Sequence, residues 1–182
     1  IDGWRDAGGG LWRARVAEVA DGNWWFEQLW VNGRRATPAR TPNRFYHYML
    51  RPVRFGVDPG TGKRTDLSKR AFLAERKDVA PLLELSAREL ADVKLVAYHS
   101  WATGQHRIAA LEPVDDASVR VITTGPARWP FFRWGARQRY HLEGFRAALD
   151  EPGEWCLERD GTLSYLPRPG EDMRAARFAG DV

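Results

Sequence analysis

The 182-residue sequence has a single cysteine, Cys156, and only four lysines beside its 24 arginines. A lone cysteine cannot form an intrachain disulfide, and no Cys/His spacing of the zinc-site type is present, so we expect neither a disulfide framework nor a bound metal. Cys156 fits a small buried residue of a strand. No apolar run approaches the roughly 18 residues needed to cross a bilayer, so we expect no membrane partner.

The sequence also begins, at Ile1-Asp2-Gly3-Trp4, without an initiator methionine or the apolar core of a signal peptide. Its 43% hydrophobic and 29% charged residues are typical of a globular chain with its own core. We therefore expect residues 1–182 to be one β-rich domain, excised from a larger protein. The compartment of that protein is not encoded in this stretch.

Motifs for several common functions are missing. Gly60-Thr61-Gly62-Lys63 lacks the spacing of a phosphate-binding loop, and no G-x-S-x-G element accompanies the serines. We expect no cofactor. The basic residues of 34–77, twelve against three acids, are scattered and lack the signature of a known nucleic-acid-binding fold. A solvated surface is therefore favoured over a polyanion site, and no nucleic-acid partner is expected.

Short strands separated by turns dominate the pattern. Residues 11–19 alternate with a period of two, and Asn32-Gly33 favours a tight hairpin turn between 26–31 and 34–37. Further strands are expected at 93–101, 107–111 and 119–123, with a turn at 103–105 and a helical turn at 145–149. Ser86 and Glu89 have the spacing of a helix capping box. The structure of 44–80 is not predicted.

A hairpin is also expected at the acidic stretch near the C-terminus. Its strands, 154–158 and 162–166, are joined through Arg159-Asp160-Gly161, and each flank carries a Pro-Gly pair that ends a strand. Trp155, Leu157, Leu163 and Tyr165 are expected on one face. The fold class is therefore all-β, an antiparallel β-sandwich or barrel with one or two short helical segments.

Candidate chemistry centres on carboxylates and aromatic rings. A glycoside hydrolase needs two carboxylates, and Glu143, Asp150, Glu151 and Glu154 lie close together in the sequence near Tyr140 and Trp155. Carboxylates beside turns more often cap the backbone, so none is assigned a catalytic role. Nine tryptophans are many for this length, and Trp101 and Trp134 are candidates for stacking on sugars.

Three blocks resemble a known family: LWVNGRRATPARTPN (29–43), AYHSWATGQHRI (97–108) and QRYHLEGFRAALDEPGEWCLERDGTLSYLPRPGEDM (138–173). They resemble segments of bacterial right-handed parallel β-helix proteins related to glycoside hydrolases, some of which act on fucose- or xylose-containing glycans. Cys156, Ser164 and Gly144 depart from the commoner pattern, which leaves local packing in doubt. The segment 44–80 carries little resemblance.

The resemblance implies a β-sandwich-type domain inserted into a carbohydrate-active β-helix parent, which would be secreted or periplasmic. The parent would carry the catalytic carboxylates, and this chain would shape or stabilise the substrate cleft. A stand-alone glycan-binding module is the alternative, and a polyanion binder is a third hypothesis. If the chain contacts a glycan, the residues expected to do so are His99, Trp101, His106, Arg139 and Tyr140.

Overall fold

The computed structural model describes residues 1–181, which form two compact units. Unit 1 comprises residues 1–40 together with 144–182, and unit 2 comprises residues 41–143. The second unit is thus inserted in sequence between the two halves of the first. The expectation of one β-rich domain did not anticipate this division.

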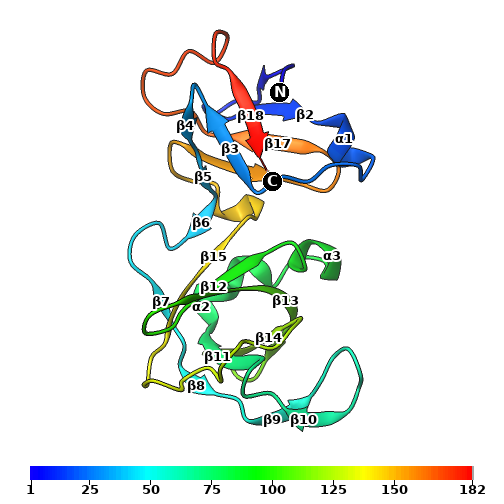
Figure 1. The fold of residues 1–182 in the computed structure, drawn as a ribbon, viewed down its shortest axis with the longest axis vertical. Helices are drawn as coiled ribbons and strands as arrows, with labels where there is room; N and C mark the ends of the chain where they lie inside the picture. The colour runs from blue at the N-terminus through cyan, green and yellow to red at the C-terminus, as the bar shows by residue number, and fades with distance from the viewer. Residues whose placement is uncertain (182) are drawn as a thin grey trace. The chain divides into compact units, whose positions relative to one another are not determined.

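Unit 1 contains two sheets (Figure 1). Its elements are β1 (Arg5–Asp6), β2 (Trp12–Arg15), α1 (Ala17–Ala20), β3 (Gln28–Val31), β4 (Arg34–Arg35), β5 (Thr37–Pro38), the 3₁₀ helix η2 (Arg146–Ala148), β16 (Glu154–Leu157), β17 (Thr162–Tyr165) and β18 (Phe178–Asp181). The sheet orders are β1-β2-β17-β16-β5 and β18-β3-β4. All pairs are antiparallel except β16 with β5.

One hydrophobic core joins the two sheets of unit 1. Phe26 stacks on Trp155 with ring centroids 5.5 Å apart, and Leu29 of one sheet and Leu163 of the other are both fully buried in the same cluster. A core between two sheets is the arrangement of a β-sandwich. Burial of aromatic side chains of this size is a large part of what stabilises such a unit.

The predicted hairpins of unit 1 are confirmed. Asn32 and Gly33 both have positive φ, 52° and 74°, as the tight turn between β3 and β4 requires. In the second hairpin Trp155 pairs with Tyr165 and Leu157 with Leu163, and all four side chains enter the core. Cys156 is buried in β16, as expected.

Unit 2 is built on one long antiparallel sheet, with order β15-β12-β13-β14-β11-β8. Its elements are β7 (His47–Tyr48), β8 (Arg51–Pro52), β9 (Phe55–Val57), β10 (Arg64–Asp66), β11 (Ala71–Glu75), α2 (Arg76–Val79), η1 (Ala80–Leu82), α3 (Ala87–Leu90), β12 (Lys94–Tyr98), β13 (Thr103–Pro113), β14 (Ser118–Thr123) and β15 (Arg139–Glu143), while β6 (Arg40–Thr41) spans the boundary between the units. The strands β9 and β10 form a separate hairpin. The capping box of Ser86 and Glu89 begins α3, as predicted.

A short segment of unit 2 supplies a paired strand at each of the two edges of this sheet. β7 pairs with β15, and β8, three residues further on, pairs with β11. The segment 47–52 therefore satisfies backbone groups that two edge strands would otherwise expose to another chain. The sheets within 1–181 do not close into a barrel, and the all-β fold with short helical segments is confirmed.

Two sequence expectations were wrong. The strand expected over 11–19 ends at Arg15, and residues 17–20 form the helical turn α1. Gly161 packs against the chain at this point: the Val16 N–H donates to the Gly161 carbonyl at 2.8 Å, and a Cβ on Gly161 would lie 2.4 Å from the Val16 carbonyl oxygen. The turn expected at 103–105 lies instead at 99–102, where the His99 N–H donates to the Ala102 carbonyl at 2.8 Å. None of the helices within 1–181 is long and apolar enough to cross a membrane.

Candidate functional site

The turn between β12 and β13 places His99 and Trp101 beside two further tryptophans of the loop that leads into β15. We call His99, Trp101, Trp129 and Trp134 the aromatic cluster. Trp134 lies 4.7 Å from Trp101 and 5.0 Å from Trp129 between ring centroids, in edge-to-face contacts. His99 contacts Trp129 and Trp134 in the same way, at 5.9 and 6.0 Å. Such pairs each contribute roughly 0.5–1.5 kcal/mol beyond the area they bury, so the cluster is held as one group.

The cluster is only partly covered. Trp101 is 69% exposed and Trp134 is 38% exposed, whereas His99 is buried. Trp101 keeps most of its surface in water while it contacts the Trp134 ring, so it is not a core residue. Trp101 therefore presents a largely exposed aromatic ring, held in place by Trp134.

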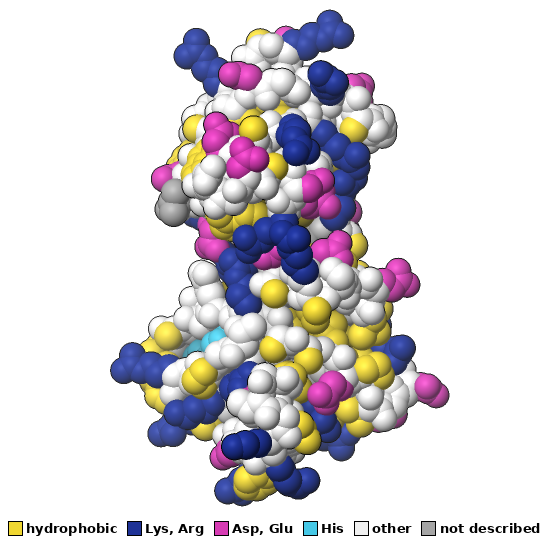
Figure 2. All heavy atoms as spheres, turned by 90° about the vertical axis from the view of Figure 1, so that its right-hand side faces the viewer, with side chains coloured by type: hydrophobic (Ala, Val, Ile, Leu, Met, Phe, Trp, Pro, Cys, Tyr) yellow, Lys and Arg dark blue, Asp and Glu magenta, His cyan; other side chains and the backbone are white. Residues whose placement is uncertain are grey.

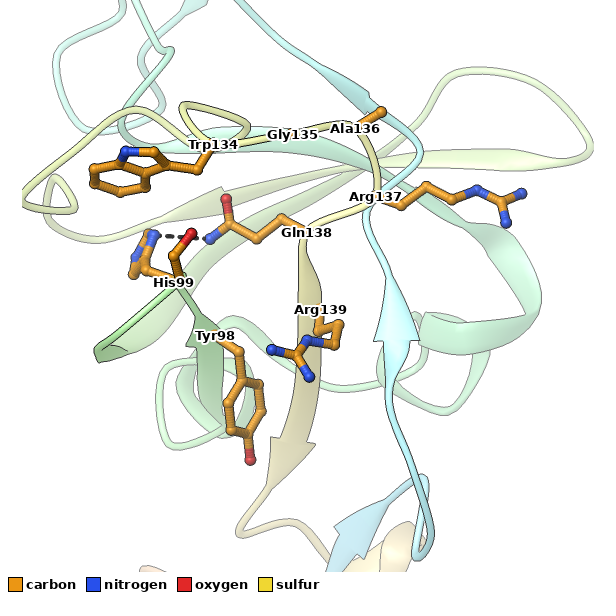
Figure 3. Close-up of a pocket in the computed structure, with 9 residues that line it drawn as sticks. Tyr98, His99, Trp134, Gly135, Ala136, Arg137, Gln138 and Arg139 are labelled. Carbon is orange, nitrogen blue, oxygen red and sulfur yellow. Dashed lines mark hydrogen bonds between the residues drawn. The ribbon is translucent and has the colours of Figure 1, made fainter.

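A pocket of about 150 Å³ adjoins the cluster (Figure 3). Its lining comes from the end of β12 and from the loop before β15: Tyr98, His99, Ser100 and residues 134–139. The loop contains three residues with positive φ: Phe132 at 70°, Gly135 at 151° and Arg137 at 68°. The volume is below the 300–1,000 Å³ typical of pockets for drug-sized ligands, so it suits one ring or one substituent of a larger molecule.

Gln138 determines which nitrogen of the His99 ring carries the proton. The Phe132 N–H donates to Gln138 Oε1 at 2.9 Å, which identifies the other end of the amide as the donor. Gln138 Nε2 lies 3.0 Å from His99 Nδ1, and Figure 3 shows the amide facing the imidazole. His99 Nδ1 must therefore accept, and the neutral ring carries its proton on Nε2. Burial lowers the pKa of His99, which favours this neutral form.

His106 lies on β13 next to the protonated nitrogen of His99. A Cβ placed on Gly104 would lie 2.8 Å from His106 Nε2 and 3.4 Å from His99 Nε2, so both nitrogens face the space that this glycine leaves open. His106 Nε2 is shielded from solvent and has no hydrogen-bond partner among residues 1–181. Burial, and then the charge of His99, lower the pKa of His106. A hydroxyl or a water molecule between the rings would satisfy both nitrogens, because either can accept and donate.

The hydrogen bonds around His99 disfavour a metal ion at this pair. A metal on Nε2 would require Nδ1 to donate, yet Nδ1 faces the donor end of Gln138. Within 1–181 no group of three or more His, Cys, Asp or Glu side chains is arranged to hold a metal ion. The imidazoles therefore serve as hydrogen-bonding groups.

The two predicted residues of β15 lie in different surroundings. Arg139 is exposed and lines the pocket, with its guanidinium 4.9 Å from the Tyr46 ring and 5.9 Å from the Tyr98 ring. Tyr140 is fully buried, 5.2 Å from Phe72, and its hydroxyl has no partner among residues 1–181. Burial, and then the charges of Asp78 and Glu75, raise the pKa of Tyr140 well above its ordinary value. Because Tyr140 does not line the pocket, we exclude it from the proposed surface.

Glu143 lies beside two side chains that bind its carboxylate, His141 and Lys94. It accepts from His141 Nε2 at 3.0 Å and lies 3.5 Å from Lys94 Nζ. Burial alone would raise the pKa of Glu143, but the hydrogen bond from His141 and the charges of His141 and Lys94 lower it. On the other side of the ring, His141 Nδ1 forms a hydrogen bond of 3.0 Å with the Tyr98 hydroxyl. Glu143 is thus an ionised acceptor within a polar chain of unit 2.

The carboxylate of Glu154 accepts hydrogen bonds from the backbone of unit 1. It is 3% exposed and accepts the N–H groups of Asp150 and Glu151 at 3.1 Å and of Arg40 at 3.3 Å. Burial raises its pKa despite these hydrogen bonds. Asp150 and Glu151 are exposed beside the turn that Glu154 holds. The four candidate carboxylates are therefore divided between the units, and the buried ones are committed to local hydrogen bonds.

Comparison with known proteins identifies the fold. No protein-family model matches the sequence, and no curated protein matches it. Among solved structures, a chain described as "Glycoside hydrolase" is similar, with a TM-score of 0.67 and 21% sequence identity over 98% of this chain. The matched region is 30% of that chain, so this sequence spans less than a third of its length. The fold of residues 1–181 is therefore similar to that of part of that chain, and the similarity does not extend to a β-helix.

Some of the residues predicted from the sequence lie side by side in the structure. The structure brings together His99, Trp101 and His106, which were predicted, with Trp129, Gln138 and Gly104, which were not. Trp134 was predicted, together with Trp101, as a candidate for stacking on sugars. A polar residue such as Gln138 gives no sequence signal of its role, because its two partners lie 6 and 39 residues away.

Proposed function

We propose that this chain is a non-catalytic accessory region of a glycoside hydrolase, which contacts the glycan through the aromatic cluster and the adjoining pocket. The observation that carries the proposal is the exposed ring of Trp101, fixed by Trp134 next to the pocket. Aromatic faces beside a few oriented polar groups suit a sugar ring, whose C–H groups pack on the indole while its hydroxyls form hydrogen bonds.

The accessory role is supported by two further observations. Glu143 and Glu154 are bound by local donors, so neither is poised as a free acid or base of a hydrolytic pair. The similar structure is a chain more than three times as long as the region matched, which leaves room for a catalytic site elsewhere in a protein of that kind. A β-helix parent acting on fucose- or xylose-containing glycans remains our proposal from the sequence resemblance.

The alternative is a glycan-binding module that acts by itself. Both possibilities use the aromatic cluster, and they differ in affinity: a wall of a larger cleft binds weakly alone, whereas a stand-alone module binds a glycan tightly enough to saturate. Titration calorimetry of the 182-residue chain with neutral and acidic oligosaccharides distinguishes them.

The test of the surface compares two variants that each lose one exposed aromatic side chain of unit 2. Trp101→Ala removes the ring of the cluster, and Phe55→Ala removes a ring that is 55% exposed on the β9–β10 hairpin. We expect Trp101→Ala to weaken glycan binding at least fivefold, because stacking on an aromatic face contributes about 1 kcal/mol or more. Equal affinities of the two variants, both with the circular dichroism of the unchanged protein, would overturn the proposed surface. Hydrolysis of aryl fucosides or xylosides by the chain itself would overturn the non-catalytic role.

A further inference from the structure

The loop and strands that carry the aromatic cluster have an uneven charge. Between Asp116 and Glu143 the sequence contains no acidic residue, while it contains five arginines. One of these, Arg120, is paired with Glu112 at 2.6 Å. The other four are exposed and form no ion pair with a carboxylate within 1–181: Arg128, Arg133, Arg137 and Arg139.

Each of these four arginines lies beside a tryptophan of the aromatic cluster or lines the pocket. The guanidinium of Arg128 lies 4.8 Å from the Trp129 ring, and that of Arg133 lies 5.3 Å from the Trp134 ring. Arg137 and Arg139 line the pocket. Figure 3 shows Arg139 beside Tyr98, below Gln138, and Arg137 extending away from Trp134. The pocket and the rings of Trp129 and Trp134 therefore have a rim of positive charge.

Arginines elsewhere in the chain that have a structural role are paired with carboxylates. Arg70 is paired with Asp58, and Arg168 lies 3.2 Å from Glu171, where it also donates to the Arg35 carbonyl. In each case a carboxylate of the chain compensates the guanidinium. Around the pocket no carboxylate does so, and a ligand that supplies one gains a charge-assisted, bidentate hydrogen bond.

We infer that the glycan recognised at this surface is anionic, with a sugar carboxylate or sulfate held by the arginines of the pocket rim while the sugar ring packs on Trp101. This inference rests on the proposed function and adds the chemical class of the ligand. The pocket volume of about 150 Å³ limits the recognised part to one acidic sugar or one charged substituent. Uronic acids and sulfated sugars share this chemistry, and the test below separates them.

A nucleic acid would also combine aromatic and basic contacts, but the arrangement favours a sugar. Single-stranded nucleic acids stack successive bases on a row of aromatic faces. Here the tryptophans pack edge to face on one another, and Arg128 and Arg133 cover the rings of Trp129 and Trp134. Trp101 is the tryptophan of the cluster whose ring is largely open. On the face of the molecule drawn in Figure 2, Lys and Arg side chains stand among hydrophobic and acidic ones.

The experiment measures binding of the 182-residue chain by calorimetry to pairs of ligands that differ only in charge. The first pair is an oligogalacturonate and its fully methyl-esterified form, and the second is a sulfated dextran oligosaccharide and unmodified dextran. We expect the acidic member of one pair to bind about tenfold or more tightly than its neutral counterpart, because one charge-assisted hydrogen-bond pair is gained. The pair that shows the difference identifies carboxylate or sulfate as the group recognised.

Two double variants locate the effect. Arg137→Gln with Arg139→Gln removes two charges from the pocket, and Arg5→Gln with Arg174→Gln removes two exposed charges from unit 1. We expect the preference for the acidic ligand to disappear in the first and to persist in the second. An equal loss in both would mean that only net charge matters and would overturn the pocket assignment; thermal melts confirm that each variant is folded.

The remaining outcomes separate this inference from the proposed function. Equal binding of acidic and neutral ligands that is still weakened by Trp101→Ala would overturn the inference and leave the glycan surface standing. Absence of binding to every glycan would overturn both. Tighter binding of an oligonucleotide with the same number of charges than of any acidic glycan would overturn the inference in favour of a nucleic-acid ligand.

Discussion

Gln138 Nε2 lies 3.0 Å from His99 Nδ1, and the Phe132 N–H holds the other end of the same amide at 2.9 Å. This pair of hydrogen bonds turns His99 into a donor that faces His106 across Gly104. The orientation of one amide therefore decides what the buried side of the aromatic cluster offers to a ligand.

Replacing Gln138 by glutamate should reverse the tautomer of His99. The carboxylate would still accept from the Phe132 N–H, but it would require a proton on His99 Nδ1 and would raise the pKa of His99. The ¹⁵N chemical shifts of the imidazole report this directly. Gln105→Glu, an exposed position on β13, is the matched control and should leave the His99 signals unchanged. Identical spectra for Gln138→Glu and the unchanged protein would contradict the assigned hydrogen bonds.

Gly104→Ala should destabilise the chain for a steric reason. Its Cβ would lie 2.8 Å from His106 Nε2, which is closer than Cβ atoms approach other heavy atoms, and Gly104 does not have a positive φ. We expect a loss of about 1–3 kcal/mol in the free energy of unfolding, the usual cost of overpacking. Gly125→Ala is the control, because nothing lies within 4 Å of its added Cβ. Denaturant unfolding of the two variants tests the difference, and equal midpoints would show that the imidazoles do not face Gly104.

Stability should depend on pH through the two histidines. Burial lowers the folded pKa of His99 and His106 below the unfolded value of about 6.5. The unfolded chain therefore binds more protons in this range, so the contribution of the pair is complete above about pH 6.5 and is lost as the pH falls through the folded pKa. The raised pKa of Glu154 acts in the opposite direction, since its contribution is lost as the pH rises.

The variant His106→Gln separates the effect of the histidines from that of Glu154, because Glu154 is present in both the variant and the unchanged protein. Between pH 7.5 and 5.5 the unfolding midpoint of the variant should fall less steeply than that of the unchanged protein. Parallel curves would mean that His106 titrates alike in the folded and unfolded chain.

Glu154 should matter for stability and not for hydrolysis. Glu154→Ala leaves the N–H groups of Asp150, Glu151 and Arg40 without their acceptor, and a buried donor left unsatisfied costs about 1–3 kcal/mol. Glu151→Ala removes an exposed carboxylate and should change the free energy of unfolding by no more than about 0.5 kcal/mol. Thermal unfolding of both variants makes the comparison. A stable Glu154→Ala variant would reopen the question of a chemical role for this carboxylate.

Local chemistry made the hairpins predictable. Asn32-Gly33 tolerates the two positive φ angles of its turn, and the alternation around Arg159-Asp160-Gly161 places four large side chains on one face. The capping box at Ser86 is likewise contained within four residues. Each of these features is fixed by residues close together in sequence, so the sequence is sufficient to show it.

The remaining features depend on residues far apart. β5 pairs in parallel with β16 across more than 110 residues, and the two halves of unit 1 are also joined by the pairs β2–β17 and β3–β18. Gly104 suggested a turn, but its lack of a side chain instead makes room for His106 within β13. Tyr140 packs against Phe72, which is far away in the sequence. No pattern of neighbouring residues predicts this contact or the burial that comes with it.

The most direct test of the proposed glycan surface uses the nine tryptophans as reporters. Each indole gives one N–H signal in a ¹H–¹⁵N spectrum, and the signals can be followed as an oligosaccharide is added. The account predicts that the signals of Trp101, Trp129 and Trp134 shift together and saturate, while those of Trp12 and Trp30 in unit 1 stay in place. Shifts confined to unit 1, or no shift in the aromatic cluster at a glycan concentration that saturates binding, would contradict it.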